Sequence, residues 1–221
     1  MKTGIIFDLD GTLLDSMGLW VNAGGYYLES MNIIPEEGLG HKLLEMNMEQ
    51  GASYIKKTYG LELSVPQICH GINSLLVKYY AEKVMAKDGV IEFLNFLKEK
   101  NIPFSIATNT DRFLFEPCLK RLGIYDLFTC ILTCSELKTS KNVPDIFFEA
   151  SKRMNSDPEH TYVFEDALYS LKTAKEAGFI TAGIYDKYTQ MSFEGNEIKK
   201  YSIHYFEDYS QVLNQMKEIL K

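Results

Sequence analysis

Short apolar runs alternate with segments of helical periodicity over most of this chain. Five runs are rich in β-branched and aromatic residues: residues 3–7, 103–107, 128–133, 162–164 and 180–184. Runs without polar alternation are typical of strands buried on both faces, as in a parallel sheet. The pattern therefore predicts an α/β fold with a doubly wound, Rossmann-like parallel sheet of five or six strands and helices on both faces.

The alternation stops between about residues 16 and 87. Apolar periodicity there predicts helices over about residues 17–31, 36–46, 49–59 and 65–84, with no convincing strand among them. We therefore predict an α/β core of residues 1–15 and 88–221 and an inserted helical cap of residues 16–87. Two linkers would join the cap to the core, which is the geometry of a lid. A last helix over about residues 208–220 is expected to close the core.

Composition and charge favour small-molecule chemistry. The 221 residues are 46% hydrophobic and 24% charged, which is typical of an ordered globular protein. The formal charge is -7, and no basic block exceeds two residues. We therefore expect no binding to nucleic acid or to an anionic membrane. No signal peptide or long apolar span is recognisable, which predicts a cytoplasmic protein, and the four scattered cysteines read as reduced structural thiols.

Two carboxylates follow the first apolar run, Asp8 and Asp10 in the sequence DLDGT. At about 4 Å such a pair repels by roughly 4 kcal/mol at an effective dielectric near 20. A hard divalent cation removes that cost, and oxygen ligands suit magnesium. Asp8 is then a candidate nucleophile, and Asp10 a candidate acid and base. The alternative is a solvated acidic turn after a strand.

Polar residues also follow the second run, in SIATNT. The Thr108 hydroxyl and the Asn109 backbone amide would suit one phosphoryl oxygen. The alternative is a helix N-cap, because Thr110 or Asp111 can begin the next helix.

A second acidic pair, Glu165 and Asp166 in TYVFEDA, follows the fourth run. It indicates a shared metal ion, or alternatively a cap for the helix that begins near residue 167. Lys141 in SKNVPDIF would offset the charge of Asp8 and of a phosphate, although Lys138 is only three residues away. Because parallel strands present their carboxyl ends along one edge, we expect these groups to meet there.

In order and spacing, DLDGTLLDS, SIATNT, SKNVPDIF and VFEDALYSLKTAKEAG resemble the four motifs of the haloacid dehalogenase superfamily. The similarity is to the branch with a helical cap between the first two motifs, which includes β-phosphoglucomutases and phosphoglycolate phosphatases. The resemblance implies that Asp8 is the phosphorylated nucleophile and Asp10 the general acid and base. It makes Thr108 the phosphate ligand and Lys141 the charge-balancing lysine.

The resemblance also implies a magnesium ion. Its ligands would be Asp8, the backbone carbonyl of Asp10, and Asp166, with Glu165 nearby or bound through water. An aspartate at position 10 resembles the phosphate-handling members, whereas the dehalogenases lack an acid there. Relatives often have Lys-Pro where this chain has Lys141 and Asn142, so the choice between Lys138 and Lys141 stays open.

The cap is expected to select the substrate, a small phosphorylated metabolite, through Trp20, Asn47 and Met48, alongside Asn109 of the core. Ordinary packing inside the cap is the alternative for the three cap residues. Capped sugar-phosphate mutases usually carry a histidine and an arginine where this chain has Trp20 and Met48. We therefore predict magnesium-dependent hydrolysis of a phosphate monoester by a monomer or weak homodimer. The alternatives are a phosphomutase and a catalytically idle binding protein.

Overall fold

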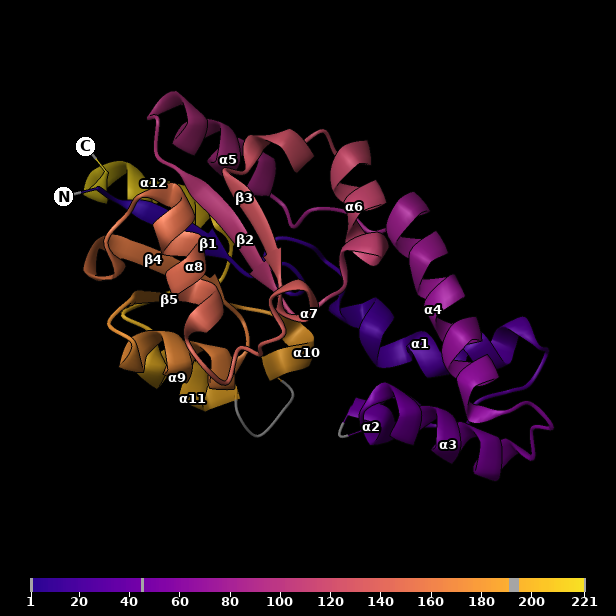
Figure 1. Cartoon of the computed structure of the whole chain (residues 1–221). Helices are drawn as coiled ribbons and strands as arrows, with labels where there is room; N and C mark the ends of the chain where they lie inside the picture. Colours follow the sequence, from indigo (N-terminus) through magenta and orange to yellow (C-terminus); the bar gives the residue numbers. More distant parts are fainter. Residues whose placement is uncertain (1, 45, 191–194, 221) are drawn as a thin grey trace.

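One parallel six-stranded sheet forms the centre of the computed structural model, which describes residues 2–44, 46–190 and 195–220 (Figure 1). The spatial order is β3-β2-β1-β4-β5-β6. The strands are β1 (Gly4–Phe7), β2 (Phe104–Thr108), β3 (Cys130–Thr133), β4 (Thr161–Glu165), β5 (Ile180–Ile184) and β6 (His204–Phe206). From β1 the strand order runs to β2 and β3 on one side and to β4, β5 and β6 on the other. The carboxyl end of β1 is therefore at a topological switch point, where ligands bind in such sheets.

The predicted fold class is confirmed, with differences at the ends of the strands. β2 extends through Thr108 and β4 through Glu165, so both polar residues are the last residues of buried strands. The third strand begins at Cys130 rather than at residue 128. The sixth strand was not located in the sequence, because three residues at the edge of a sheet give too short a pattern.

Helices cover both faces of the sheet (Figure 1). Ile5 and Phe7 pack in one apolar cluster with α5 (Val90–Glu99) and α12 (Tyr209–Ile219). Ile6, between them, packs in a second cluster with α8 (Asp145–Met154) and α9 (Leu168–Glu176). This alternation is the period of two expected when side chains of a strand point to opposite faces.

The remaining helices of this part of the chain are shorter or lie beside the sheet. They are α6 (Arg112–Arg121), α7 (Cys134–Leu137), α10 (Lys187–Gln190) and α11 (Gly195–Tyr201), with two 3-10 turns at Tyr125–Leu127 and Pro158–His160. The predicted last helix buries Val212, Leu213 and Met216, whereas Ile219 is 40% exposed. None of the described helices combines the length and apolar character needed to span a membrane.

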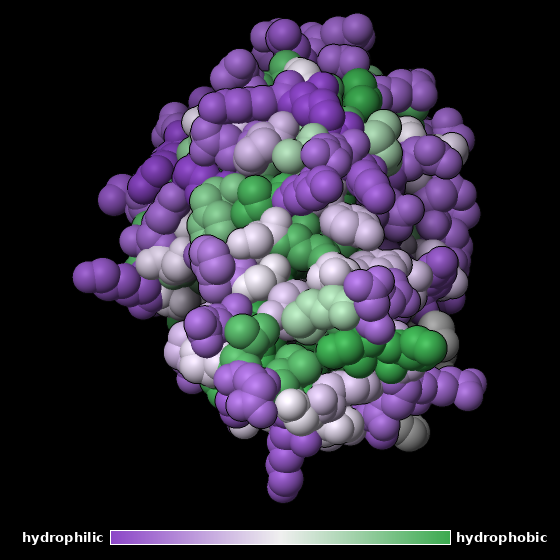
Figure 2. Space-filling view, turned by 90° about the vertical axis from the view of Figure 1, so that its right-hand side faces the viewer, coloured by the Kyte–Doolittle hydropathy of each residue, from purple (hydrophilic) through white to green (hydrophobic). Residues whose placement is uncertain are grey.

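Four helices between residues 16 and 87 pack beside the sheet: α1 (Met17–Ser30), α2 (Leu39–Leu44), α3 (Met48–Tyr59) and α4 (Val65–Glu82) (Figure 1). Capping boxes formed by Asn47 with Gln50 and by Ser64 with Gln67 set the starts of α3 and α4. Viewed from the right-hand side of Figure 1, the surface is mostly hydrophilic, with groups of apolar residues exposed on it (Figure 2). We refer to α1–α4 as the cap helices.

The two connections between the cap helices and the sheet run side by side. The Asp15 backbone N–H donates to the Met85 carbonyl at 3.0 Å, and the Lys87 N–H donates to the Leu13 carbonyl at 2.9 Å. The apolar cluster that includes Phe7 continues through Leu14 and Leu19 into the cap helices. The cap helices therefore extend from the carboxyl end of β1, directly over the acidic residues.

Candidate active site

The carboxyl end of β1 positions Asp8 and Asp10 differently. Asp8 is 9% exposed and directly follows the strand, with its backbone N–H bonded to the Phe164 carbonyl of β4. The chain then turns at Gly11, whose φ of +82° is a conformation that favours glycine. A Cβ atom on Gly11 would lie 2.4 Å from Asp166 Oδ2. The glycine thus allows the loops after β1 and β4 to approach each other closely.

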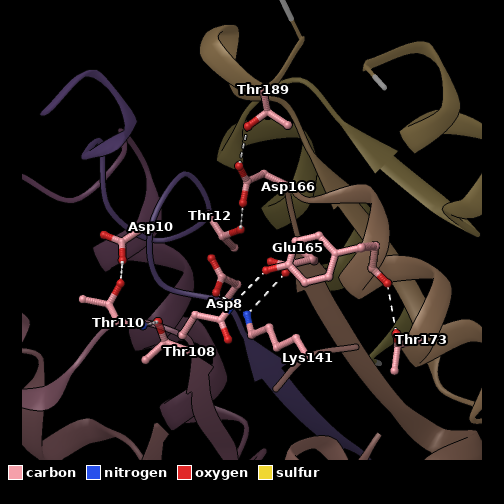
Figure 3. A network of polar contacts seen from close by, with 12 residues as sticks. Asp8, Asp10, Thr12, Thr108, Thr110, Lys141, Glu165, Asp166, Thr173 and Thr189 are labelled. Atoms are coloured by element: carbon pink, nitrogen blue, oxygen red, sulfur yellow. Dashed lines mark hydrogen bonds and ion pairs between the residues drawn. The ribbon is translucent and has the colours of Figure 1, made fainter. Parts of the chain in front are cut away.

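Lys141 lies beside Asp8. Its side chain is 1% exposed, and its Nζ contacts Asp8 Oδ1 and lies 3.3 Å from Glu165 Oε1 (Figure 3). Lys138 is exposed and ends α7 in a left-handed conformation, with φ of +53°. Of the two lysines that the sequence left open, Lys141 is the one that the structure brings to the acidic residues.

The second acidic pair comes from β4 and the residue after it. Asp166 accepts hydrogen bonds from Thr12 at 3.3 Å and from Thr189 at 2.7 Å (Figure 3). Glu165 is 1% exposed, and its Oε2 has no hydrogen-bond partner among the described residues. The buried Ser170 hydroxyl lies close enough to lower the pKa of Glu165, but a buried carboxylate with so few donors is costly and can accept a further positive group.

Asp8, Glu165 and Asp166 fit a divalent cation. Each offers one carboxylate oxygen, and these atoms lie within 4.8 Å of one another. Three carboxylates beside the single ammonium of Lys141 leave two negative charges uncompensated in a buried place. Hard oxygen donors and this charge suit magnesium. The side chain of Asp10 is not in the cluster, so its predicted role as a ligand rests on its backbone carbonyl alone.

Burial perturbs the titration of this cluster. Burial raises the pKa of Asp8, although the positive charge of Lys141 opposes this shift. Burial and the negative charge of Asp8 together raise the pKa of Glu165 well above its usual range. Burial, followed by the charge of Asp8, raises the pKa of Asp166 to about 7. A bound divalent cation would favour the ionised forms and oppose these shifts.

Asp10 is held on the side away from the cluster, by three hydroxyl groups. Its Oδ1 accepts from Ser16 at 2.6 Å and from Tyr80. Its Oδ2 accepts from Thr110 at 2.6 Å (Figure 3). Trp20 Nε1 donates to the Tyr80 hydroxyl at 2.8 Å, which links the first and last cap helices to Asp10. The sequence analysis missed Ser16, Tyr80 and Thr110 as partners of Asp10. Tyr80 and Thr110 are 70 and 100 residues away, and Ser16, six residues away, carries no signal that marks it as a partner.

A cavity of about 720 Å³ opens above these residues. Asp8, Asp10, Glu165 and Asp166 line its floor side, with Thr108 and Asn109 beside them. Thr108 Oγ1 accepts the Thr110 backbone N–H at 3.0 Å, and Asn109 Nδ2 donates to the Tyr169 hydroxyl at 2.6 Å. The N-cap of α6 is Asp111, without a side-chain capping bond, so Thr108 is not used as a helix cap.

The cap helices supply the other side of the cavity. Trp20 and Met48 both line it, together with Met17, Val21 and Asn73. Trp20 and Met48 also line an adjoining, mostly apolar recess of about 280 Å³ within the cap helices. The third predicted cap residue, Asn47, lines only that recess, and its side-chain oxygen caps α3 by accepting the Gln50 N–H at 2.9 Å.

The helix α10 contributes two cavity residues that the sequence analysis did not find, Tyr188 and Thr189. α10 contacts α1, where Gly18 leaves room: a Cβ there would lie 2.9 Å from the Tyr188 hydroxyl. Thr12 was missed as well, although it lies within DLDGT. Its hydroxyl donates to Asp166, which follows the distant strand β4, and only the fold reveals this contact.

Comparison with known proteins agrees with this arrangement. The family model for haloacid dehalogenase-like hydrolases matches residues 5–184. A phosphorylated carbohydrates phosphatase of Thermotoga maritima is 27% identical over 174 residues, covering 79% of this chain and 81% of the relative. A phosphoglycolate phosphatase of Shigella boydii is 26% identical over 207 residues, covering 82% and 80% of the two chains.

Solved structures show the same fold. A Thermotoga maritima protein assigned as a β-phosphoglucomutase superposes with a TM-score of 0.87 at 24% identity, covering 98% of this chain and 99% of the other. CbbY from Rhodobacter sphaeroides, solved with phosphate, gives a TM-score of 0.75 at 20% identity and covers 96% of each chain. With the family model matching most of its length, this chain belongs to the haloacid dehalogenase-like hydrolases.

Proposed function

We propose that the protein hydrolyses a small phosphate monoester with the help of magnesium, through an aspartyl-phosphate on Asp8. One observation carries the proposal: Asp8 lies between a buried lysine and two further buried carboxylates, at the floor of a cavity. This arrangement matches phosphoryl transfer, in which catalysis consists mainly of positioning and charge stabilisation. The two relatives described above are phosphatases, which supports the same reaction class.

In the first step a carboxylate oxygen of Asp8 forms a bond to phosphorus, and the bond from phosphorus to the alcohol oxygen breaks. Asp10 gives that oxygen a proton, so the product leaves as a neutral alcohol. In the second step water attacks the phosphorus of the aspartyl-phosphate while Asp10 takes its proton. Inorganic phosphate leaves and the Asp8 carboxylate is restored.

The other residues act on charge and orientation. Lys141 offsets the negative charge of Asp8 and of the transferring group, and the burial of its ammonium strengthens that effect. Thr108 and Asn109 supply neutral donors at the end of β2. Asp8, Asp166 and the Asp10 carbonyl would hold magnesium, with Glu165 beside it, and the ion would supply positive charge next to the phosphoryl oxygens.

The alcohol part of the substrate is uncharged in this proposal. None of the described residues that line the cavity is Lys, Arg or His, and residues 45 and 191–194 of the sequence include no basic residue either. A second phosphate or a carboxylate on the alcohol would meet Asp111, Trp20 and Met48 rather than a cation. The core of residues 1–15 and 88–221 would perform the chemistry, and the cap of residues 16–87 would select the alcohol.

A matched pair of substrates tests the charge of the alcohol. We expect phenyl phosphate to be turned over at least about tenfold more efficiently than 4-carboxyphenyl phosphate, because a carboxylate placed against the apolar cap wall finds no cation and lies near further acidic groups, and tenfold corresponds to about 1.4 kcal/mol. Met48→Lys should reduce the difference in kcat/KM between the two esters, because it adds a cation to the side of the cavity formed by the cap helices. Equal kcat/KM values for the two esters in the parent protein would contradict an uncharged alcohol.

A panel of sugar, nucleotide and cofactor phosphates, assayed with magnesium and with EDTA, tests the activity itself. The proposal predicts phosphate release from at least one ester in magnesium and none in EDTA. Failure to release phosphate from any member would favour a binding protein. Feeding β-glucose 1-phosphate separates the mutase, which would give the 6-phosphate, from the phosphatase, which would give free sugar.

A further inference from the structure

The loops after β2 and β4 meet above Asp8. Asn109 directly follows the last residue of β2, and Tyr169 lies in the first turn of α9, after β4. These two strands are the neighbours of β1 on either side, and strands are about 4.8 Å apart, so β2 and β4 are separated by about 10 Å. The Asn109–Tyr169 hydrogen bond of 2.6 Å crosses that interval, over the strand that carries Asp8.

The Tyr169 hydroxyl has a proton left to donate. Its oxygen accepts the Asn109 amide N–H, and the phenol itself donates no hydrogen bond to any described residue, although the Glu165 carboxylate lies nearby. The side chain is 39% exposed and lines the same cavity as Asp8 and Thr108. A phenol that accepts one hydrogen bond from the protein is therefore oriented with its O–H available to a ligand in the cavity.

A phosphoryl group at Asp8 needs more donors than the charged residues provide. Its three terminal oxygens each accept more than one hydrogen bond, and Lys141 is the only basic side chain in contact with Asp8 among the described residues. Alongside the proposed magnesium ion, neutral donors at the rim can supply the rest. Tyr169 and Asn109 both line the cavity that Asp8 and Thr108 also line.

We propose that the Tyr169 hydroxyl donates a hydrogen bond to a phosphoryl oxygen of the substrate, as a further phosphate-binding residue beside Asn109. The proposal rests on the proposed function, because it places the phosphoryl group on Asp8. It differs from a role in alcohol selection, since a contact with the phosphoryl group acts on every ester and also on inorganic phosphate. It also differs from a role in which Tyr169 only orients Asn109.

Inhibition by inorganic phosphate and by orthovanadate tests the contact. Tyr169→Phe removes the hydroxyl and keeps the ring. We expect both inhibition constants to rise about tenfold, the usual effect of losing a hydrogen bond to a charged group. The loss in kcat/KM should be the same for p-nitrophenyl phosphate and for a sugar phosphate. Tyr185→Phe is the matched control, because Tyr185 is 37% exposed but outside the cavity, and its constants should not change.

A double-mutant cycle separates the direct contact from an effect through Asn109. In an Asn109→Ala background, Tyr169→Phe should still weaken phosphate inhibition several-fold. If the second substitution has no effect there, Tyr169 acts only through Asn109 and the proposal is wrong. A loss that varies with the alcohol, or a matching loss of magnesium affinity, would also overturn it. If the parent protein releases no phosphate from any ester, the proposed function fails, and binding of orthovanadate measured by calorimetry still tests Tyr169.

Discussion

Lys141 keeps a positive charge although its side chain is buried. Burial alone would lower the pKa of its ammonium, but the charges of Asp8 and Glu165 outweigh burial and hold the pKa above its usual range. The side chain is therefore a fixed positive charge next to Asp8. The sequence indicated a lysine in this segment but left Lys138 and Lys141 open, because both lie in the same short stretch after β3. Only the path of the chain to the edge of the sheet distinguishes them.

Lys141→Met and Lys138→Met form a matched pair of variants. We expect Lys141→Met to lower kcat/KM for p-nitrophenyl phosphate by at least about 100-fold, because removing one preorganised charge-stabilising donor from an active site commonly costs about 100- to 1,000-fold in kcat. Lys138→Met should remain within about twofold of the parent, since surface charges contribute little. Steady-state kinetics in magnesium are the measurement, with circular dichroism to check the fold. Equal activities for the two variants would mean that Lys141 does not assist the reaction.

The elements that build the site meet through their end loops, at the carboxyl edge of the sheet. The apolar runs located five of the six strands, and polar residues at strand ends located Asp8, Thr108 and Asp166. The short elements β6 and α10 were not located, since three or four residues carry no reliable period. Thr189 of α10 was missed for the same reason, although it bonds Asp166.

Gly11→Ala tests the close approach of the loops after β1 and β4. The new Cβ would lie 2.4 Å from Asp166 Oδ2, and alanine is strained at φ of +82°. We expect magnesium-dependent activity to fall by more than about tenfold, because the Asp166 carboxylate, a proposed metal ligand, must move. Gly123→Ala is the control: its φ is +71° and no atom lies within 4 Å, so it should cost about 1 to 2 kcal/mol of stability by strain alone and leave activity intact. If both variants lose the same activity, the contact with Asp166 is not what matters.

At the scale of the whole molecule, a sheet holds acidic groups from distant parts of the chain in one buried cluster. Asp8 and Asp166 are far apart in sequence, yet the pairing of β1 with β4 brings them together. The fold class followed from the sequence because the apolar pattern is repeated along the chain. The continuity of the apolar core into the cap helices could not be predicted from the sequence, because it depends on tertiary packing.

The cluster makes stability depend on pH and magnesium. In the folded protein the pKa of Asp166 is raised to about 7, so without metal the ionised side chain disfavours folding. The free energy of unfolding therefore falls as pH rises from about 4 to about 7, and this contribution is constant above pH 7. Asp166→Asn removes that cost. In EDTA the free energies of unfolding of the variant and the parent should be equal near pH 4. At pH 8 that of the variant should be higher by a few kcal/mol, as expected from the size of the pKa shift of Asp166. In magnesium at pH 8 the advantage should shrink, because bound metal stabilises only the parent.

Urea denaturation of both proteins at each pH is the measurement. A parent that is more stable than Asp166→Asn at pH 8 in EDTA would contradict the unfavourable ionisation of the cluster. Equal responses of the two proteins to magnesium would contradict the role of Asp166 as a ligand.

The central claim is that Asp8 accepts the phosphoryl group. Rapid acid quenching of the protein during turnover of p-nitrophenyl phosphate in magnesium, followed by mass spectrometry of its peptides, tests this most directly. The account predicts a phosphoryl group on the peptide that contains Asp8, and neither phosphopeptide nor turnover in Asp8→Asn. Turnover by Asp8→Asn at the parental rate, or a phosphoryl group on a different residue, would contradict it.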